Sequence, residues 1–171
     1  MWSRRRVIFV GVTGAVAACT ALVLPRLASS GAAPSGVALA SGHADMLRSI
    51  TQALLGSALP TDAHARNREL TRVTTATGAL ITNLPPSTRK EIADLFGLLA
   101  LKLARALLGY SGDWAGADIA AVTIFLAGLR DSSIGLKQQA YFALHDLLIG
   151  SFYAEPSTWA ATGYPGPPQL T

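Results

Sequence analysis

Cysteine is almost absent from this chain of 171 residues, because the one cysteine is Cys19, close to the N-terminus. A disulfide within the chain is therefore excluded, as are haem attachment of the Cys-x-x-Cys-His type and cysteine-ligated iron–sulfur clusters. The residues after the first 40, which we call the body of the protein, contain no thiol, so an oxidising compartment poses no difficulty for them. That body must be held together by its apolar core.

Motifs of nucleotide and hydrolase sites are missing as well. Neither Gly-x-Gly-x-x-Gly nor Gly-x-Ser-x-Gly occurs. We expect His43 and His64 to face solvent, and the adjacent His145 and Asp146 point about 100° apart on a helix, so they do not converge on one metal. The sequence therefore predicts a chain that is not an enzyme by itself and has no cofactor or metal site of its own.

Charge is also sparse, at 14% of residues, and its positive excess is confined to the first 40 residues. That segment holds four of the fourteen basic residues and none of the ten acidic ones, so the remainder carries ten charges of each sign. A neutral body gives no argument for binding nucleic acid.

The N-terminus has the organisation of an export signal. Arg4-Arg5-Arg6 precedes the uncharged stretch 7–24, and Ser3 to Ile8 resembles the twin-arginine motif, with Arg4 and Arg5 as the pair. The small residues Ala38 and Ala40 fit a signal peptidase, which predicts cleavage before Ser41 and a signal over residues 1–40.

Two other fates of this segment remain open. The stretch 7–24 is nearly long enough to stay as an uncleaved membrane anchor, and Cys19 ends a sequence that resembles a lipidation site. All three alternatives place the body in the periplasm or on the outer face of the cytoplasmic membrane.

The rest of the chain has helical periodicity and no strand alternation, which predicts an all-α fold, a small bundle of about five helices. We expect the Thr88–Leu108 helix to be central, because it is apolar round much of its circumference. The organisation predicted is a helical domain over 41–163 and an extended Pro-rich C-terminal tail over 164–171. The five helices are expected at His43–Leu59, 61–84, Thr88–Leu108, Trp114–Arg130 and Ile134–Tyr153.

The C-terminal segment is the most distinctive part of the sequence. Pro156 ends the last helix, a short turn presents Trp159, and the prolines that follow favour an extended conformation. This segment either packs back on its own bundle or binds a partner. The candidate contact residues are Trp159, Tyr164, Pro165, Gly166 and Pro167, with Tyr153 and Trp114 as secondary candidates.

The C-terminal segment has three stretches in a fixed order. A helix ends in Phe152-Tyr153, and it is followed by Glu155-Pro156-Ser157-Thr158-Trp159 and then by Gly163-Tyr164-Pro165-Gly166-Pro167. This arrangement resembles the small-subunit family of flavin-dependent gluconate, sorbitol and related sugar or alcohol dehydrogenases. The resemblance extends in organisation over residues 44–168. It implies a non-catalytic small subunit that binds and stabilises a large catalytic subunit carrying FAD, and helps to export it through the twin-arginine translocase. A cytochrome subunit is a further partner that the resemblance allows.

A different class of function also fits the sequence. The chain could be an independent periplasmic or membrane-attached helical protein with a structural or ligand-carrying role.

Overall fold

The computed structural model describes residues 35–166, and these contain seven α-helices, two 3-10 helices and no strand. The all-α prediction is confirmed. The predicted export residues Arg4 and Arg5, the anchor stretch 7–24, Cys19 and the end of the predicted tail lie outside the described residues. In chain order the elements are α3 (Gly36–Gly42), α4 (Ala44–Leu55), η1 (Gly56–Ala58), α5 (Ala63–Thr82), α6 (Pro86–Ala100), α7 (Lys102–Leu108), α8 (Ile119–Arg130), α9 (Gly135–Tyr153) and η2 (Pro156–Thr162).

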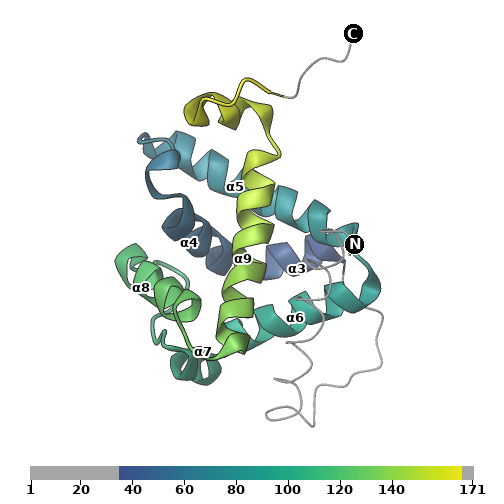
Figure 1. The fold of residues 1–171 in the computed structure, drawn as a ribbon, viewed down its shortest axis with the longest axis vertical. Helices are drawn as coiled ribbons and strands as arrows, with labels where there is room; N and C mark the ends of the chain where they lie inside the picture. Colours follow the sequence, from purple (N-terminus) through teal and green to yellow (C-terminus); the bar gives the residue numbers. More distant parts are fainter. Residues whose placement is uncertain (1–34, 167–171) are drawn as a thin grey trace, which may run out of the picture.

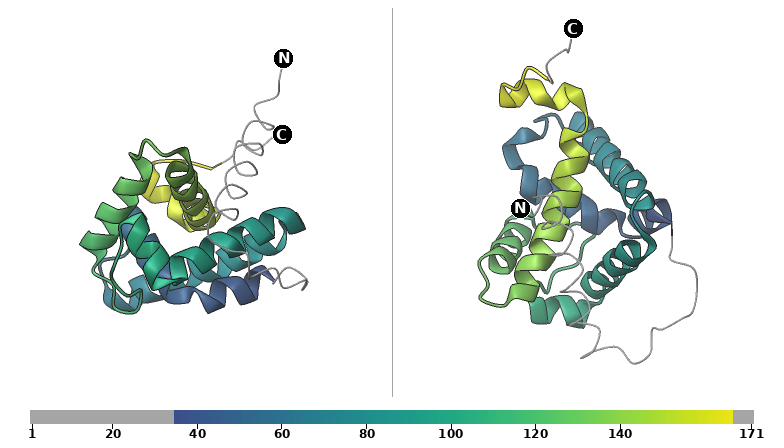
Figure 2. Two further views of the ribbon diagram at one scale, coloured as in Figure 1. Left: turned by 90° about the horizontal axis from the view of Figure 1, so that it is seen from below. Right: turned by 45° about the vertical axis from the view of Figure 1, so that its right-hand side comes forward.

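The centre of the molecule is formed by α4, α5 and α9. Figure 1 shows α9 lying across α4 and α5, with α7 and α8 near its N-terminal end. Both α4 and α5 place fully buried side chains beneath α9, among them Leu47, Ile50 and Val73. The 3-10 helix η2 folds over the opposite end of α9, away from α7 and α8 (Figure 2). The long helix α9 therefore connects two distant ends of the molecule.

The expectation of one central helix over Thr88–Leu108 is wrong in its second half. Leu101 has an extended backbone, with φ −72° and ψ 115°, which separates α6 from α7. The predicted apolar stripe is buried along α6, but Leu103 and Leu107 on α7 are each 77% exposed. Because the break changes the direction of the helix axis, the apolar stripe of α6 does not continue on the inner side of α7.

Two other helix boundaries differ from the expected ones. The first predicted helix is preceded by an additional helix, α3, from which α4 is separated at His43 (φ −122°, ψ 26°). The predicted Trp114–Arg130 helix begins five residues later, where Asp118 Oδ1 accepts a hydrogen bond of 3.0 Å from the Ala120 amide. Gly116, with φ +70°, precedes this N-cap in a conformation that glycine adopts without strain.

Threonines are frequent in α5, although β-branched residues are modest helix formers. Their hydroxyls donate to the carbonyl one turn earlier, as Thr74 does to Leu70 at 2.9 Å. Thr77 also joins α5 to α9, because its hydroxyl lies 3.0 Å from that of Ser151. Both side chains are buried, so this polar pair fixes how α5 and α9 are aligned.

Thr77→Val tests this alignment, since it replaces the buried hydroxyl by a methyl group of similar size. We expect the free energy of unfolding to fall by about 1–2 kcal/mol, because Ser151 loses a buried partner. Urea unfolding at constant m value measures the change. Thr75→Val is the matched control: its exposed hydroxyl bonds only to the Thr71 carbonyl, so a loss below about 0.5 kcal/mol is expected. Equal losses in the two variants would contradict the assigned role.

Candidate partner-binding surface

The C-terminal end of α9 is capped by side chains of the segment that follows it. The last carbonyls of a helix have no partner within the helix, and here Thr158 and Trp159 supply donors. Trp159 Nε1 donates to the Tyr153 carbonyl at 2.7 Å, and Thr158 Oγ1 lies 3.4 Å from the Phe152 carbonyl oxygen. Thr158 Oγ1 also lies 2.7 Å from the Glu155 carbonyl oxygen, just beyond the end of α9. The Glu-Pro-Ser-Thr-Trp sequence thus folds η2 back over the end of its own helix.

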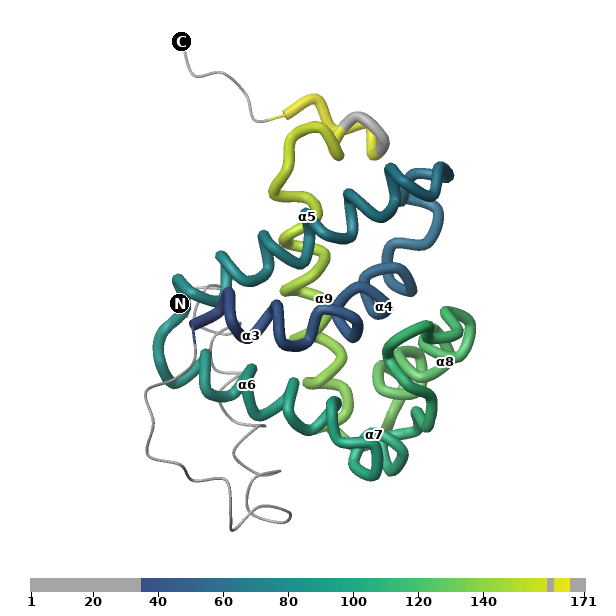
Figure 3. Tube along the Cα trace, turned by 180° about the vertical axis from the view of Figure 1, so that it is seen from behind, coloured from purple at the N-terminus to yellow at the C-terminus, as the bar shows by residue number. Residues whose placement is uncertain are grey.

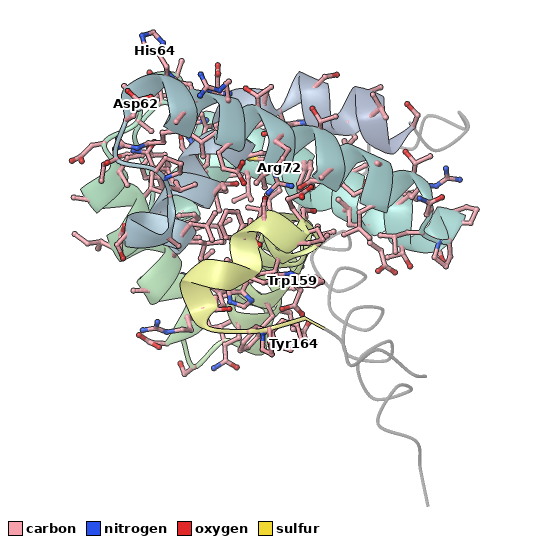
Figure 4. The ribbon with its side chains drawn as sticks, turned by 90° about the horizontal axis from the view of Figure 1, so that it is seen from above. Asp62, His64, Arg72, Trp159 and Tyr164 are labelled. Carbon is pink, nitrogen blue, oxygen red and sulfur yellow. The ribbon has the colours of Figure 1, made fainter. Side chains whose placement is uncertain are left out.

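Trp159 also packs against the aromatic ring of Tyr164. Its ring lies 5.4 Å from that of Tyr164 at an interplanar angle of 64°, an edge-to-face arrangement. The Tyr164 amide donates to the Trp159 carbonyl at 3.3 Å. Gly163 and Gly166 have φ of +72° and +97°, which lets the chain turn back against the indole. Figure 4 shows Trp159 and Tyr164 side by side on this segment.

Arg72 attaches this end of α9 to α5. Its Nη2 donates to the Phe152 carbonyl at 3.2 Å, and its guanidinium lies 5.9 Å from the centre of the Phe152 ring. Glu69, one turn earlier on α5, accepts from Arg72 Nε at 3.0 Å. Trp159 is bonded to the C-terminal end of α9, and Arg72 fixes this end of α9 to α5.

Most of the predicted contact residues meet here. Five of them lie within residues 153–166, and we name these five the C-terminal surface: Tyr153, Trp159, Tyr164, Pro165 and Gly166. Tyr153 and Trp159 are partly buried and Pro165 is exposed, while Tyr164 is 50% exposed. The predicted Pro167 lies outside the described residues.

Trp114, the remaining candidate, is 8% exposed and belongs to the core. Its Nε1 donates to the Leu99 carbonyl at 2.9 Å, and its ring lies 4.6 Å from that of Tyr110. The buried Arg105 lies 5.6 Å from the centre of the indole and donates to Asp113 Oδ1 at 2.8 Å. Trp114 thus joins α6 to the loop before α8, and we leave it out of the C-terminal surface.

A second surface, which the sequence does not predict, is formed by exposed leucines on α7 and at its N-cap. Leu101, Leu103 and Leu107, which we name the α7 patch, are all exposed, whereas Arg105 on the same helix turns inward and donates to the Ala100 carbonyl at 3.1 Å. Leu101 itself does not predict this reversal, because leucine is a good helix former. The one available hint is the charged pair Lys102 and Arg105 within an otherwise apolar stretch.

A shallow depression of about 510 Å³ lies beside the loop between α7 and α8. Its lining is mostly backbone and small side chains, and its titratable groups include Asp113 and Asp118. Asp113 is paired with Arg105 and Asp118 caps α8. Both carboxylates thus have structural partners.

The three histidines do not meet in the fold. His43 lies between α3 and α4, His64 stands at the outer end of α5 (Figure 4), and His145 is bonded to the neighbouring Asp146 at 3.0 Å. Within residues 35–166 no three His, Cys, Asp or Glu side chains are grouped as metal ligands would be. In the same part of the chain, each helix is too short or too polar to cross a membrane.

Comparisons with known proteins return no family model, no curated protein and no solved structure that matches the chain.

Alkaline pH tests the buried Tyr110, whose hydroxyl donates to the Asp113 carbonyl at 3.1 Å. Burial raises the pKa of this phenol above its ordinary value, whereas in the unfolded chain it ionises near pH 10. The stability linked to the neutral phenol is thus complete below about pH 10 and is lost as pH rises through the folded-state pKa. We expect Tyr110→Phe to have a smaller loss of unfolding free energy than wild type between about pH 9 and 11. Parallel pH profiles from chemical denaturation would contradict this.

Proposed function

We propose that this protein is a non-catalytic small subunit that binds, stabilises and helps to export a flavin-dependent sugar or alcohol dehydrogenase. The FAD and the substrate site would belong to the large partner subunit. The resemblance of the C-terminal sequence and of the twin-arginine segment supports this proposal. The observation that carries it is the C-terminal surface, on which Trp159 is fixed by a backbone hydrogen bond and Tyr164 is held half-exposed against it.

A rigid aromatic surface favours association for a definite physical reason. Ordering side chains and loops on binding costs free energy, and here the hydrogen bonds of Trp159 and the Tyr164 amide already fix the segment. Tyrosine and tryptophan are frequent anchors of protein interfaces. The same residues therefore cap α9 and present an aromatic edge to a partner, so the two uses considered for this segment are compatible.

The α7 patch provides further support, because exposed leucines on neighbouring positions are typical of surfaces that are covered in an assembly. Leu103 and Leu107 are one helical turn apart on the same side of α7. The patch and the C-terminal surface lie at opposite ends of α9 (Figure 1). A partner that covers both must extend along the molecule, as a large catalytic subunit would.

The export segment gives this association a direction. Twin-arginine transport carries proteins that are already folded, so a large flavoprotein without its own signal could load FAD in the cytoplasm and cross the membrane bound to this chain. The complex would then work in the periplasm or at the outer face of the cytoplasmic membrane. A cytochrome subunit would be a third component.

Affinity purification from the native host tests the proposal, with a tag joined to Thr171 through a flexible linker. We expect a large chain with the absorption spectrum of flavin to be recovered. Tyr164→Ala should reduce that recovery about tenfold, as the loss of an interface anchor does. The matched control is Phe142→Ala on α9, which removes an aromatic of equal exposure, 52% against 50% for Tyr164. It should leave recovery unchanged.

Two results of this purification would contradict the proposal. A single colourless chain would favour an independent helical protein with a structural or ligand-carrying role. Equal effects of Tyr164→Ala and Phe142→Ala would separate the C-terminal surface from partner binding, even if a flavoprotein were recovered.

The export route has a test of its own. Changing Arg4 and Arg5 together to lysine keeps the positive charge but removes the guanidinium pair. We expect both this chain and its flavoprotein partner to remain in the cytoplasm, as measured by cell fractionation and flavin absorbance. Continued export of the double variant would identify a general secretory signal instead.

A further inference from the structure

The helix α3 is joined to α5 by direct contact between their backbones. A Cβ atom added to Gly36 would lie 2.4 Å from the Gly78 carbonyl oxygen and 2.4 Å from the Thr82 amide nitrogen, closer than atoms can approach. A Cβ added to Gly78 would lie 3.1 Å from the Ala40 side chain. Glycine at both positions lets the two helices pack without intervening side chains. Figure 3 shows α3 alongside the C-terminal half of α5.

The remaining contacts of α3 are those of an integral element of the domain. Leu39 and Ala40 are 7% and 2% exposed and belong to the hydrophobic core. Ser35 Oγ accepts from the Ala38 amide at 3.2 Å, which caps the helix at its start. At its end, His43 Nδ1 lies 2.9 Å from the Leu39 carbonyl oxygen. Capped at both ends and buried on one side, α3 is built like the other helices.

This arrangement conflicts with signal cleavage between Ala40 and Ser41. A cut there would remove Leu39 and Ala40 from the core and uncover Gly78 and Ile81 on α5. Proteolysis also needs exposed and flexible chain, whereas Ala40 is in a helix and buried. If the domain folds before export, as the twin-arginine route requires, the peptidase meets Ala40 in this folded form.

We propose that α3 belongs to the mature protein and that the export signal is removed N-terminal to it, between Ala32 and Ala33. This inference rests on the export part of the proposed function and is independent of the dehydrogenase partner. Ser30-Gly31-Ala32, which lies outside the described residues, places small side chains at the two positions that a signal peptidase recognises. A cut after Ala32 leaves the Ser35 cap and the whole of α3 in place.

The N-terminus of the exported protein tests the cleavage site directly. The full chain, tagged after Thr171, is expressed in its native host, and the periplasmic and membrane fractions are purified together. Intact mass and N-terminal sequencing should give Ala33 as the first residue. A start at Ser41, an uncut chain or lipidation at Cys19 would each overturn the proposal. A start at Ala33 without any flavoprotein would overturn the proposed partner alone.

A pair of glycine variants tests whether α3 holds the mature protein together. Gly36→Ala should lower the melting temperature of the exported protein by at least about 5 °C, since α3 must move away from α5. Gly42→Ala on the same helix is the matched control, because a Cβ there meets no atom within 4 Å, and its melting temperature should not fall below that of wild type, since alanine is the better helix former. Wild-type values for both variants would show that residue 36 is not in the mature protein.

A milder variant covers the case in which Gly36→Ala does not accumulate. Ala40→Gly removes one buried methyl group while keeping a small residue at the position first predicted for cleavage. We expect a lower melting temperature than wild type, by about 2 °C or more. An unchanged value would again place α3 outside the mature fold.

Discussion

The contact between α5 and α9 is the interaction on which the other parts of this molecule depend. Thr77 and Ser151 meet at its buried centre. Toward one end of α5, Arg72 holds the Phe152 carbonyl and with it the end of α9. Toward the other end, Gly78 receives α3. The single helix α5 thus positions both the C-terminal surface and α3.

The C-terminal segment combines a structural role with the binding role that we propose for it. Trp159 satisfies the Tyr153 carbonyl through its indole nitrogen while its ring supports Tyr164. A helix end must be capped in any case, so using an aromatic donor for the cap adds a rigid aromatic surface with little additional chain. This double use explains why the C-terminal motif is specific in sequence and yet packs against its own domain.

Much of this fold could be predicted from periodicity and capping. The buried residues of α6 and the cap at Asp62, whose Oδ1 accepts from the Ala65 amide at 2.7 Å, follow from local sequence. The break at Leu101 could not be predicted, because it depends on Arg105 binding Gly112 and Asp113 in the loop after α7. The helix α3 was not predicted, because its small residues resemble a signal peptidase site. In the structure these residues pack against Gly78 of α5. Likewise, the burial of Trp114 is set by residues distant in sequence, such as Ser49, which donates to its carbonyl at 3.2 Å.

The fixed position of α3 also limits how far the arginine pair can lie from the described domain. Ser35 caps α3, the first of the described helices, and thirty residues along the chain separate it from Arg5. Thirty residues of chain span at most about 100 Å when fully extended, whatever conformation they adopt. If a translocase binds the arginine pair, as proposed, the domain and any bound partner would lie within that distance of its binding site.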